Sequence, residues 1–152
     1  MNDTAAAKDA GPGPRLAPNA AMTLIIQARL VEARVESRLA ELGLSLRRFG
    51  LLGHLRATPG ISFSELARRA GIKVQSLQPI VATLVSLGFV HTVGGVGQGR
   101  AAVLELTTEG SAIFDKAVEV LTEVDAELFA ADDWKDLGAT LVRIAQTFQQ
   151  RR

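Results

Sequence analysis

The chain has 152 residues, of which 47% are hydrophobic, 22% charged and 5% aromatic, and its net charge is +1. This length suits one domain with an aliphatic core and leaves no room for a second, catalytic domain. Cysteine is absent, which excludes disulfides, thiolate catalysis and Cys-based zinc sites, and because no membrane span or signal peptide is evident, we expect a cytoplasmic protein.

The N-terminal residues 1–19 are rich in Ala, Gly and Pro, and we expect a flexible leader there, followed by a single domain over residues 20–152. Asn19 is placed to cap a helix over residues 20–42, which Gly43 would end. Large apolar residues recur at helical spacing in this segment: Leu24, Val31, Val35, Leu39 and Leu42. Arginines and glutamates alternate on its other faces, which favours a solvated surface.

A second helix begins after Ser45 and ends at Pro59-Gly60, with an apolar face of Leu46, Phe49, Leu52 and Leu55. Gly50 and Gly53 each weaken it by about 1 kcal/mol relative to alanine, which indicates close helix packing or, less commonly, a ligand. With two histidines in the chain, His54 and His91, we expect no metal site.

The segment ISFSEL contains a capping box, Ser62 and Glu65, between the two residues of a hydrophobic staple, Ile61 and Leu66. A third helix is therefore predicted to begin at Phe63. Gly71 would end it in the left-handed conformation and turn the chain.

The next helix has the apolar positions Val74, Leu77, Ile80, Val81, Leu84 and Leu87, and Gly88 follows them. Pro79 lies inside this pattern, where proline removes a backbone hydrogen bond. Either the helix is bent at Pro79, or residues 73–78 are irregular and Pro79 is its first residue. The unbroken apolar spacing favours one bent helix.

Two β-rich segments, residues 89–93 and 101–106, flank the glycine-rich stretch GGVGQGR and predict a hairpin. A phosphate-binding loop is excluded because a strand, not a helix, follows the glycines. Two short helices joined by a tight turn and followed by a hairpin make a winged helix-turn-helix over residues 45–106. The predicted fold is mainly α with a small β-hairpin wing.

The exposed face of the fourth helix is predicted to enter the DNA major groove, where glutamine pairs with adenine and serine serves either donor or acceptor edges. The candidate base-reading residues are Gln75, Ser76, Gln78, Pro79 and Thr83. Between residues 42 and 104, seven basic residues accompany one acid, Glu65, which predicts a polyanion footprint. The candidate contacts to the DNA backbone or minor groove are Arg47, Arg48, Arg68, Arg69, Lys73, Gln98 and Arg100.

Thr107 caps a long helix, and Asp132 or Asp133 begins a last one after a short bend at residues 129–131. Their apolar stripes, with that of the first helix, exceed what the small central module can cover, so we expect residues 20–44 and 107–152 to form dimerisation helices. No nucleophile lies at a recognisable spacing from either histidine, so no enzyme and no cofactor are expected.

Residues 20–152 resemble the MarR family of bacterial transcriptional regulators. The matching segments, in order, are LSLRRFGLLGHL, ISFSELARRAGI, VQSLQPIVATLVSLGFV and GQGRAAVLELTTEG. In the last, Leu106, Thr107 and Gly110 match the LT-x-x-G signature and Arg100 matches the wing arginine. Gln98 replaces the family's usual aspartate, and Gln78-Pro79 replace basic residues of the recognition helix.

The resemblance implies a homodimeric repressor that binds a palindromic site in double-stranded DNA. It also implies a small aromatic or anionic effector bound where the dimer helices meet the DNA-binding module. Arg47, Gly50, Gly53 and His54 lie near such a cleft in the sequence, but none is assigned to it. The low charge of the recognition helix motivates an alternative, a homodimer that has lost base reading and binds a protein or a ligand.

Overall fold

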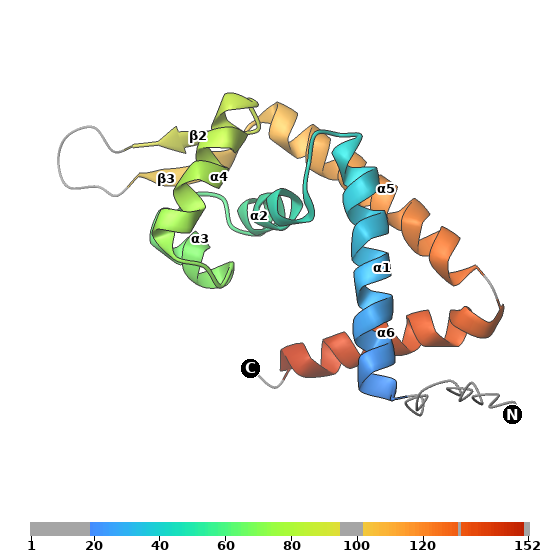
Figure 1. Cartoon of the computed structure of the whole chain (residues 1–152). Helices are drawn as coiled ribbons and strands as arrows, with labels where there is room; N and C mark the ends of the chain where they lie inside the picture. Colours follow the sequence, from blue (N-terminus) through green and yellow to red (C-terminus); the bar gives the residue numbers. More distant parts are fainter. Residues whose placement is uncertain (1–18, 95–101, 131, 151–152) are drawn as a thin grey trace, which may run out of the picture. The chain divides into compact units, whose positions relative to one another are not determined.

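The structure is a computed structural model that describes residues 19–94, 102–130 and 132–150, the side chains of residues 132, 133, 135 and 148–150 excepted (Figure 1). Its elements, in chain order, are α1 (Ala20–Ala40), α2 (Leu46–Ala57), β1 (Ile61–Ser62), α3 (Phe63–Arg69), α4 (Val74–Ser86), β2 (Val90–Val93), β3 (Val103–Leu106), α5 (Thr108–Phe129) and α6 (Asp132–Gln150). The predicted class, mainly α with a small β wing, is confirmed. Three predictions lie outside the described residues: residues 1–18 of the predicted leader, Gln98 and Arg100.

The chain divides after Glu32 into two units, and the hydrophobic core belongs to the second, Ala33–Arg152. That core is aliphatic, as the composition predicts. Its fully buried large side chains come from the end of α1, the helix-turn-helix and the sheet: Leu39, Leu51, Leu52, Leu55, Leu66, Leu77, Leu84, Val90 and Leu104. At about 25 cal/mol per Å² of apolar area, burial of one leucine stabilises the fold by about 2 kcal/mol.

Three helices end as predicted, each at a glycine with positive φ: Gly43 (70°), Gly71 (67°) and Gly88 (75°). After α4, the Gly88 N–H donates to Val85 O at 2.9 Å and the Phe89 N–H donates to Leu84 O at 3.0 Å. This pair of bonds is a Schellman motif, which needs a left-handed residue and therefore favours glycine. The same pattern at Gly71 forms the turn between α3 and α4.

Side-chain oxygens cap the predicted helix starts. Ser45 Oγ accepts from Arg48 N at 3.2 Å, Ser62 Oγ from Glu65 N at 3.2 Å, and Thr107 Oγ1 from Gly110 N at 2.9 Å. The capping box at Ser62 is only half formed among the described residues, because the Glu65 carboxylate accepts instead from Arg68 and Arg69. Two guanidinium groups bind a carboxylate more strongly than one neutral backbone N–H does.

Pro79 lies inside α4, which begins at Val74. The interpretation as one helix is therefore confirmed, and a helix start at Pro79 is wrong. Leu77, Val81 and Leu84 are buried on the inner face of this helix. Their packing stabilises the first turn, although Pro79 has no N–H to donate to the carbonyl of Gln75 four residues earlier.

The sheet has three antiparallel strands in the order β1-β3-β2. The predicted hairpin is confirmed by the pairing of β2 with β3, and β1 adds a third strand that was not predicted. The residue pairs Ile61↔Leu104 and Ser62↔Val103 join β1 to β3, and Val90↔Leu106 is the first pair of β2 with β3. A strand of two residues is too short to show alternation, and its pairing is decided by tertiary contact alone. It ties the start of α3 to the wing.

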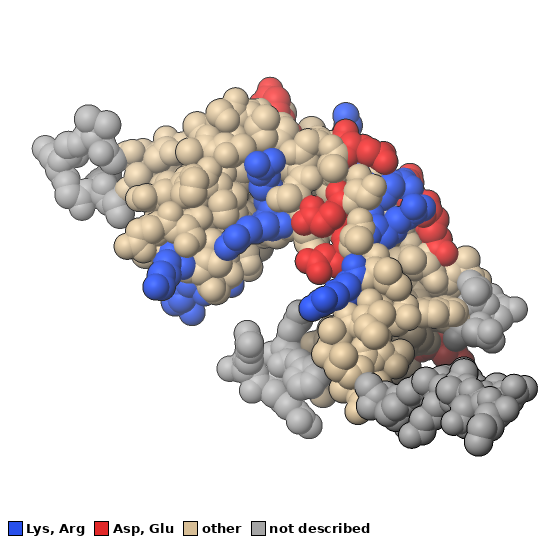
Figure 2. All heavy atoms as spheres, in the orientation of Figure 1, with Lys and Arg blue, Asp and Glu red and all other residues tan. Residues whose placement is uncertain are grey.

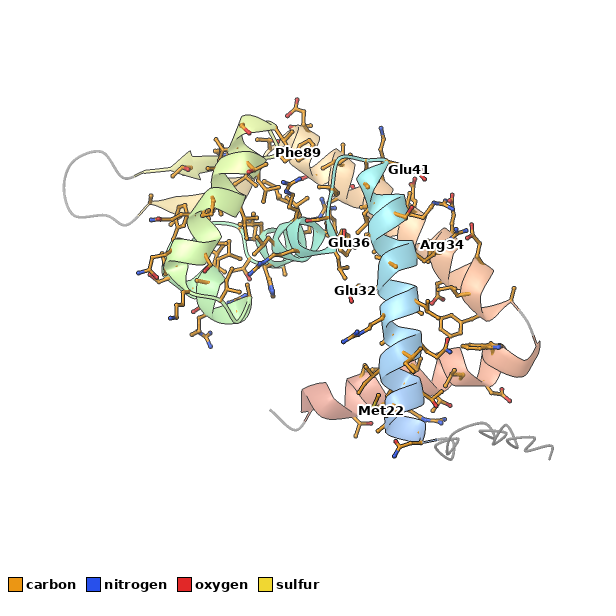
Figure 3. All side chains as sticks on the ribbon, in the orientation of Figure 1. Met22, Glu32, Arg34, Glu36, Glu41 and Phe89 are labelled. Carbon is orange, nitrogen blue, oxygen red and sulfur yellow. The ribbon has the colours of Figure 1, made fainter. Side chains whose placement is uncertain are left out.

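Arg34 is exposed on α1, as predicted, and reaches α5 (Figure 3). Arg38 also reaches α5, but its side chain is only 21% exposed, so the predicted solvated face is wrong for Arg38. Arg34 Nη2 lies 2.7 Å from Glu127 Oε2, and Arg38 binds Glu123 at 2.7 Å and Glu127 at 3.0 Å. These hydrogen bonds, with that from Arg34 the largest cause, lower the pKa of Glu127. Periodicity alone could not reveal these partners, which lie more than eighty residues away.

Candidate nucleic-acid interface

The outer face of α4 presents most of the predicted base-reading side chains to solvent. Gln75, Ser76, Gln78 and Pro79 are exposed, whereas Thr83 is half-buried. The Thr83 hydroxyl donates to Pro79 O at 2.9 Å, so its hydrogen is already used within the helix. The first two turns of α4 therefore offer two amides and one hydroxyl, groups that can both donate to and accept from base edges.

The N-terminus of α2 lies beside the middle of α4. Together they form a surface hollow of about 290 Å³, the α2–α4 hollow, lined by Ser45, Arg47, Arg48, Pro79, Ile80 and Thr83. Two predicted backbone-binding arginines and two predicted base-reading residues thus meet at one place. The free N–H groups and positive dipole end of α2 favour an anion there, and both arginines add charge.

Arg68 and Arg69 lie on α3, and both bind Glu65. Arg68 donates to the carboxylate at 2.8 and 2.7 Å, and Arg69 donates to it at 2.7 Å and to Thr58 Oγ1 at 2.7 Å. The hydrogen bonds from Arg68 and then Arg69 lower the pKa of Glu65 from 4.5 to about 2. The trio carries one net positive charge, so a DNA phosphate must compete with Glu65 for either arginine.

Lys73 is exposed and occupies the N-cap position of α4, where it forms no side-chain cap. Figure 2 shows basic side chains over α2 and α3, where acidic ones are few, and acidic side chains mixed with basic ones over α1 and α5. The uneven charge distribution predicted along the sequence thus becomes an uneven charge distribution on the surface. It gives the winged module a positive field, which attracts a polyanion.

A larger and mostly apolar hollow of about 620 Å³, the α4–β2 hollow, lies between α4, β2 and the start of α3. It is lined by Phe63, Val74, Gln78, Val81, Ala82, Val85, Ser86 and Thr92. Its volume lies within the range of small-molecule sites, about 300–1,000 Å³. The sequence did not indicate this hollow, because Phe63 and Thr92 reach α4 only through the tertiary fold.

The two glycines of α2 have different surroundings. A Cβ on Gly53 would lie 3.5 Å from the ring of Phe114, which fits the predicted helix packing, whereas a Cβ on Gly50 would meet nothing within 4 Å. Gly50 instead borders a hollow of about 180 Å³, the α2–α3 hollow, lined by Leu46, Arg47, Gly50, Leu51, His54, Ala70 and Ile72. Over residues 19–94, 102–130 and 132–150, no three His, Asp or Glu side chains are grouped as a metal site would require.

Comparisons with known proteins agree with this geometry. A model described as the MarR family matches residues 42–101. The HTH-type transcriptional repressor Rv2887 of Mycobacterium tuberculosis is 33% identical over 101 residues, which cover 66% of this chain and 73% of that protein. The chain belongs to the MarR family.

Solved structures of MarR proteins share the fold. Rv2887 in complex with salicylic acid has a TM-score of 0.65 and 27% identity, covering 85% of this chain and 98% of that one. M. tuberculosis MosR in complex with DNA has a TM-score of 0.60 and 26% identity, covering 89% and 99%. Wild-type MarR from E. coli in its apo form, at 20% identity, covers 84% and 98% with a TM-score of 0.69 and supports the fold alone.

The MarR family and the relative Rv2887 are transcriptional regulators, so this chain is a regulator and not an enzyme. The α2–α4 hollow and the exposed face of α4 lie within the matched residues 42–101. Among the described residues, no helix has the length and apolar character needed to cross a membrane. The individual roles of the residues named above remain predictions.

Proposed function

We propose that this MarR-family regulator acts in the cytoplasm as a homodimeric, ligand-responsive repressor that binds a palindromic site in double-stranded DNA. The observation that carries the proposal is the α2–α4 hollow, where Arg47 and Arg48 at a helix N-terminus lie beside the exposed uncharged face of α4. Recognition of a DNA groove has two components, side chains that neutralise phosphates and a helix that contacts base edges. Candidates for both are present at this hollow.

Affinity and specificity are divided between different residues in this proposal. Arg47, Arg48 and Lys73 contact phosphates, and Gln75, Ser76 and Gln78 contact base edges. Arg68 and Arg69 contribute less than their number suggests, because Glu65 already binds both. Gln98 and Arg100 of the wing remain candidates for the minor groove or backbone.

The first test measures specificity. Fragments that the protein binds are selected from genomic DNA, and the Kd for the best fragment is compared with that for a scrambled duplex of equal length and composition. Specific recognition predicts a ratio of about 10³ or more at physiological salt. Equal affinity for both duplexes contradicts the proposal.

The second test separates base contacts from phosphate contacts. Gln78→Ala is expected to weaken binding to the selected site by about 1–3 kcal/mol and to change binding to scrambled DNA little. Arg47→Ala is expected to weaken both and to make the salt dependence shallower by about one charge. Lys116→Ala, which removes an exposed lysine of α5, is the control and should change neither. Equal losses on both duplexes for Gln78→Ala would exclude base reading by that residue.

The homodimer is supported by apolar side chains that the described protomer leaves exposed. On α6, Trp134, Leu137, Leu141 and Ile144 follow one another at helical spacing, and each is 38–45% exposed. The part of α1 before Glu32 likewise exposes Met22, Ile25, Ile26 and Leu30. Monomeric proteins seldom expose such stripes, and contact with a second copy would bury them. A dimer with two-fold symmetry would in turn favour a palindromic DNA site.

A small aromatic effector is supported by the α4–β2 hollow and by the salicylic acid bound to Rv2887. Gln78 contributes both to this hollow and to the exposed face of α4, so a ligand there would remove a base-reading side chain from the groove. Salicylate is expected to bind the protein in isothermal titration calorimetry and to release the selected DNA. Ala82→Phe, which fills the hollow, should abolish both effects, whereas salicylate binding by this variant would place the effector elsewhere.

Two observations favour the alternative, a winged homodimer that binds a protein or a ligand without reading DNA. Glu65 neutralises one of the two arginines on α3, and the described part of α4 carries no basic side chain. Nanomolar binding to the DNA upstream of the protein's own gene at physiological salt would exclude this alternative.

A further inference from the structure

The end of the recognition helix α4 is bonded directly to the first turn of α5. The Thr107 N–H donates to Phe89 O at 3.1 Å, and the Thr107 hydroxyl donates to Gly88 O at 2.6 Å while accepting from Gly110 N at 2.9 Å. Figure 3 places Phe89 where α4 ends and α5 begins. One residue therefore caps α5 and holds both carbonyls that follow α4.

Gly110 makes this contact close. A Cβ on Gly110 would lie 1.9 Å from Phe89 O and 2.8 Å from Phe89 C, distances that no side chain tolerates. The first turn of α5 thus rests on the backbone of Phe89. The atom met is a backbone oxygen held by Thr107 N, so a rotation of a side chain cannot relieve the overlap.

The two carbonyls belong to the Schellman motif that ends α4. Gly88 has a φ of 75°, and the N–H groups of Gly88 and Phe89 are bonded back to Val85 and Leu84. The next residue, Val90, pairs with Leu106, immediately before Thr107. Gly88 and Phe89 are therefore held by α4 on one side and by Thr107 on the other, and Val90 is held by its pairing with β3.

We propose that Thr107 and Gly110 are positioning residues that fix the direction of α4 relative to α5 and thereby set the spacing of DNA half-sites that the dimer accepts. This inference rests on the proposed function, in which α5 belongs to the dimerisation helices. Two recognition helices carried on α5 can match only half-sites whose separation and rotation equal their own. If the contact of Thr107 and Gly110 with Gly88 and Phe89, here called the α4–α5 joint, were looser, each α4 could rotate relative to α5. The dimer would then also bind half-sites whose spacing differs by one base pair.

The test compares Thr107→Val with Thr107→Ser and Ser62→Ala. Valine keeps the branched shape and removes both hydroxyl bonds, whereas serine keeps the hydroxyl. Ser62→Ala removes a helix cap of the same kind on α3, outside the joint. The readout is the Kd for the selected palindrome and for versions with one base pair inserted or deleted at its centre.

Wild-type protein, Thr107→Ser and Ser62→Ala are expected to bind the altered palindromes at least about tenfold more weakly than the original, because one base pair rotates a half-site by about a tenth of a turn. For Thr107→Val, the ratio of the Kd for an altered palindrome to the Kd for the original should fall to about threefold or less. An unchanged ratio for Thr107→Val, or an equal fall for Ser62→Ala, would overturn the proposal.

A second measurement needs no DNA. Because the chain contains no cysteine, Gln75→Cys and Lys116→Cys can carry spin labels on α4 and α5 without further changes. Spin–spin distances within one protomer, measured after dilution with unlabelled protein, should broaden in Thr107→Val and remain narrow in Thr107→Ser. Unchanged spin–spin distances in Thr107→Val would overturn the positioning role of Thr107, even if the protein recognises a specific DNA site. If the protein instead shows no sequence preference, the proposed function fails, and the distances still test the positioning role.

Discussion

Gly110 explains one position of the LT-x-x-G signature in physical terms. Thr107 caps α5 and binds the end of α4, and three residues later the helix backbone comes against Phe89 O, where a Cβ does not fit. Gly50 is a contrast, because its missing Cβ would meet no atom within 4 Å. A backbone contact therefore requires glycine at position 110, whereas no described contact requires it at position 50.

These two glycines predict opposite effects of alanine. Gly110→Ala is expected to lower the free energy of unfolding by about 3 kcal/mol, since α5 or the β2 end must move to relieve the overlap. Gly50→Ala is expected to raise it by up to about 1 kcal/mol through helix propensity. Urea unfolding followed by circular dichroism measures both. A Gly110→Ala protein as stable as wild type would contradict the contact with Phe89.

Glu65 predicts a pH dependence of stability. Its pKa falls from 4.5 to about 2 because Arg68 and Arg69 bind the ionised carboxylate, so its stabilisation is present above about pH 4.5 and is lost as the pH falls toward 2. In that window the urea midpoint of wild type should fall more steeply than that of Glu65→Gln. The effect should shrink in high salt, since both partners are exposed. Glu119→Gln is the control, and its urea midpoint should fall with pH as steeply as that of wild type. An equally shallow pH dependence in Glu119→Gln and Glu65→Gln would exclude the Arg68–Glu65–Arg69 cluster as the cause.

At the scale of elements, α4 combines a strong packing face with a weak backbone position. Leu77, Val81 and Leu84 are buried, while Pro79 leaves the Gln75 carbonyl without its intrahelical donor. Because Gln75 is exposed, water can satisfy that carbonyl in the free protein. Tertiary packing thus overrides local propensity, and the helix begins five residues before its proline.

Pro79→Ala is therefore expected to raise the free energy of unfolding by about 1–3 kcal/mol. The loop proline Pro59 is the matched control, because Pro59→Ala only frees the unfolded chain and should lower stability by about 0.4–1 kcal/mol. Urea midpoints of the two variants should move in opposite directions. A lower midpoint for Pro79→Ala would mean that α4 depends on its proline.

At the scale of the whole molecule, the core of the winged module is complete and the terminal helices are not covered. Fully buried leucines fill α2, α3 and α4, whereas the large apolar side chains of α6 remain at least 38% exposed wherever they are described. A second copy would bury them, and stability would then depend on protein concentration.

Leu141→Glu places a charge in the middle of the α6 stripe. If this stripe is the dimer interface, wild-type protein should be a dimer in light scattering and Leu141→Glu a monomer with a lower Tm that no longer rises with concentration. Gln146→Glu adds the same charge to α6 outside the stripe and should remain dimeric. A dimeric Leu141→Glu would move the interface away from α6.

The sequence by itself determined most of the fold, because its signals are local. Ser45, Ser62 and Thr107 start helices through hydroxyls three residues from their partners, and Gly71 and Gly88 end helices through backbone conformation. The exposed face of α4 followed from the 3.6-residue period, which places Gln75 and Gln78 outside the buried stripe of Leu77, Val81 and Leu84.

Only the tertiary structure decided which distant groups meet. It joined β1 to β3, gave the Glu65 carboxylate to two arginines instead of a helix cap, connected Arg38 to α5, and brought Arg47 beside Pro79. It also placed Gly110 on Phe89 O. These contacts depend on how helices pack in three dimensions, and periodicity along the chain carries no information about which side chain lies across a helix interface.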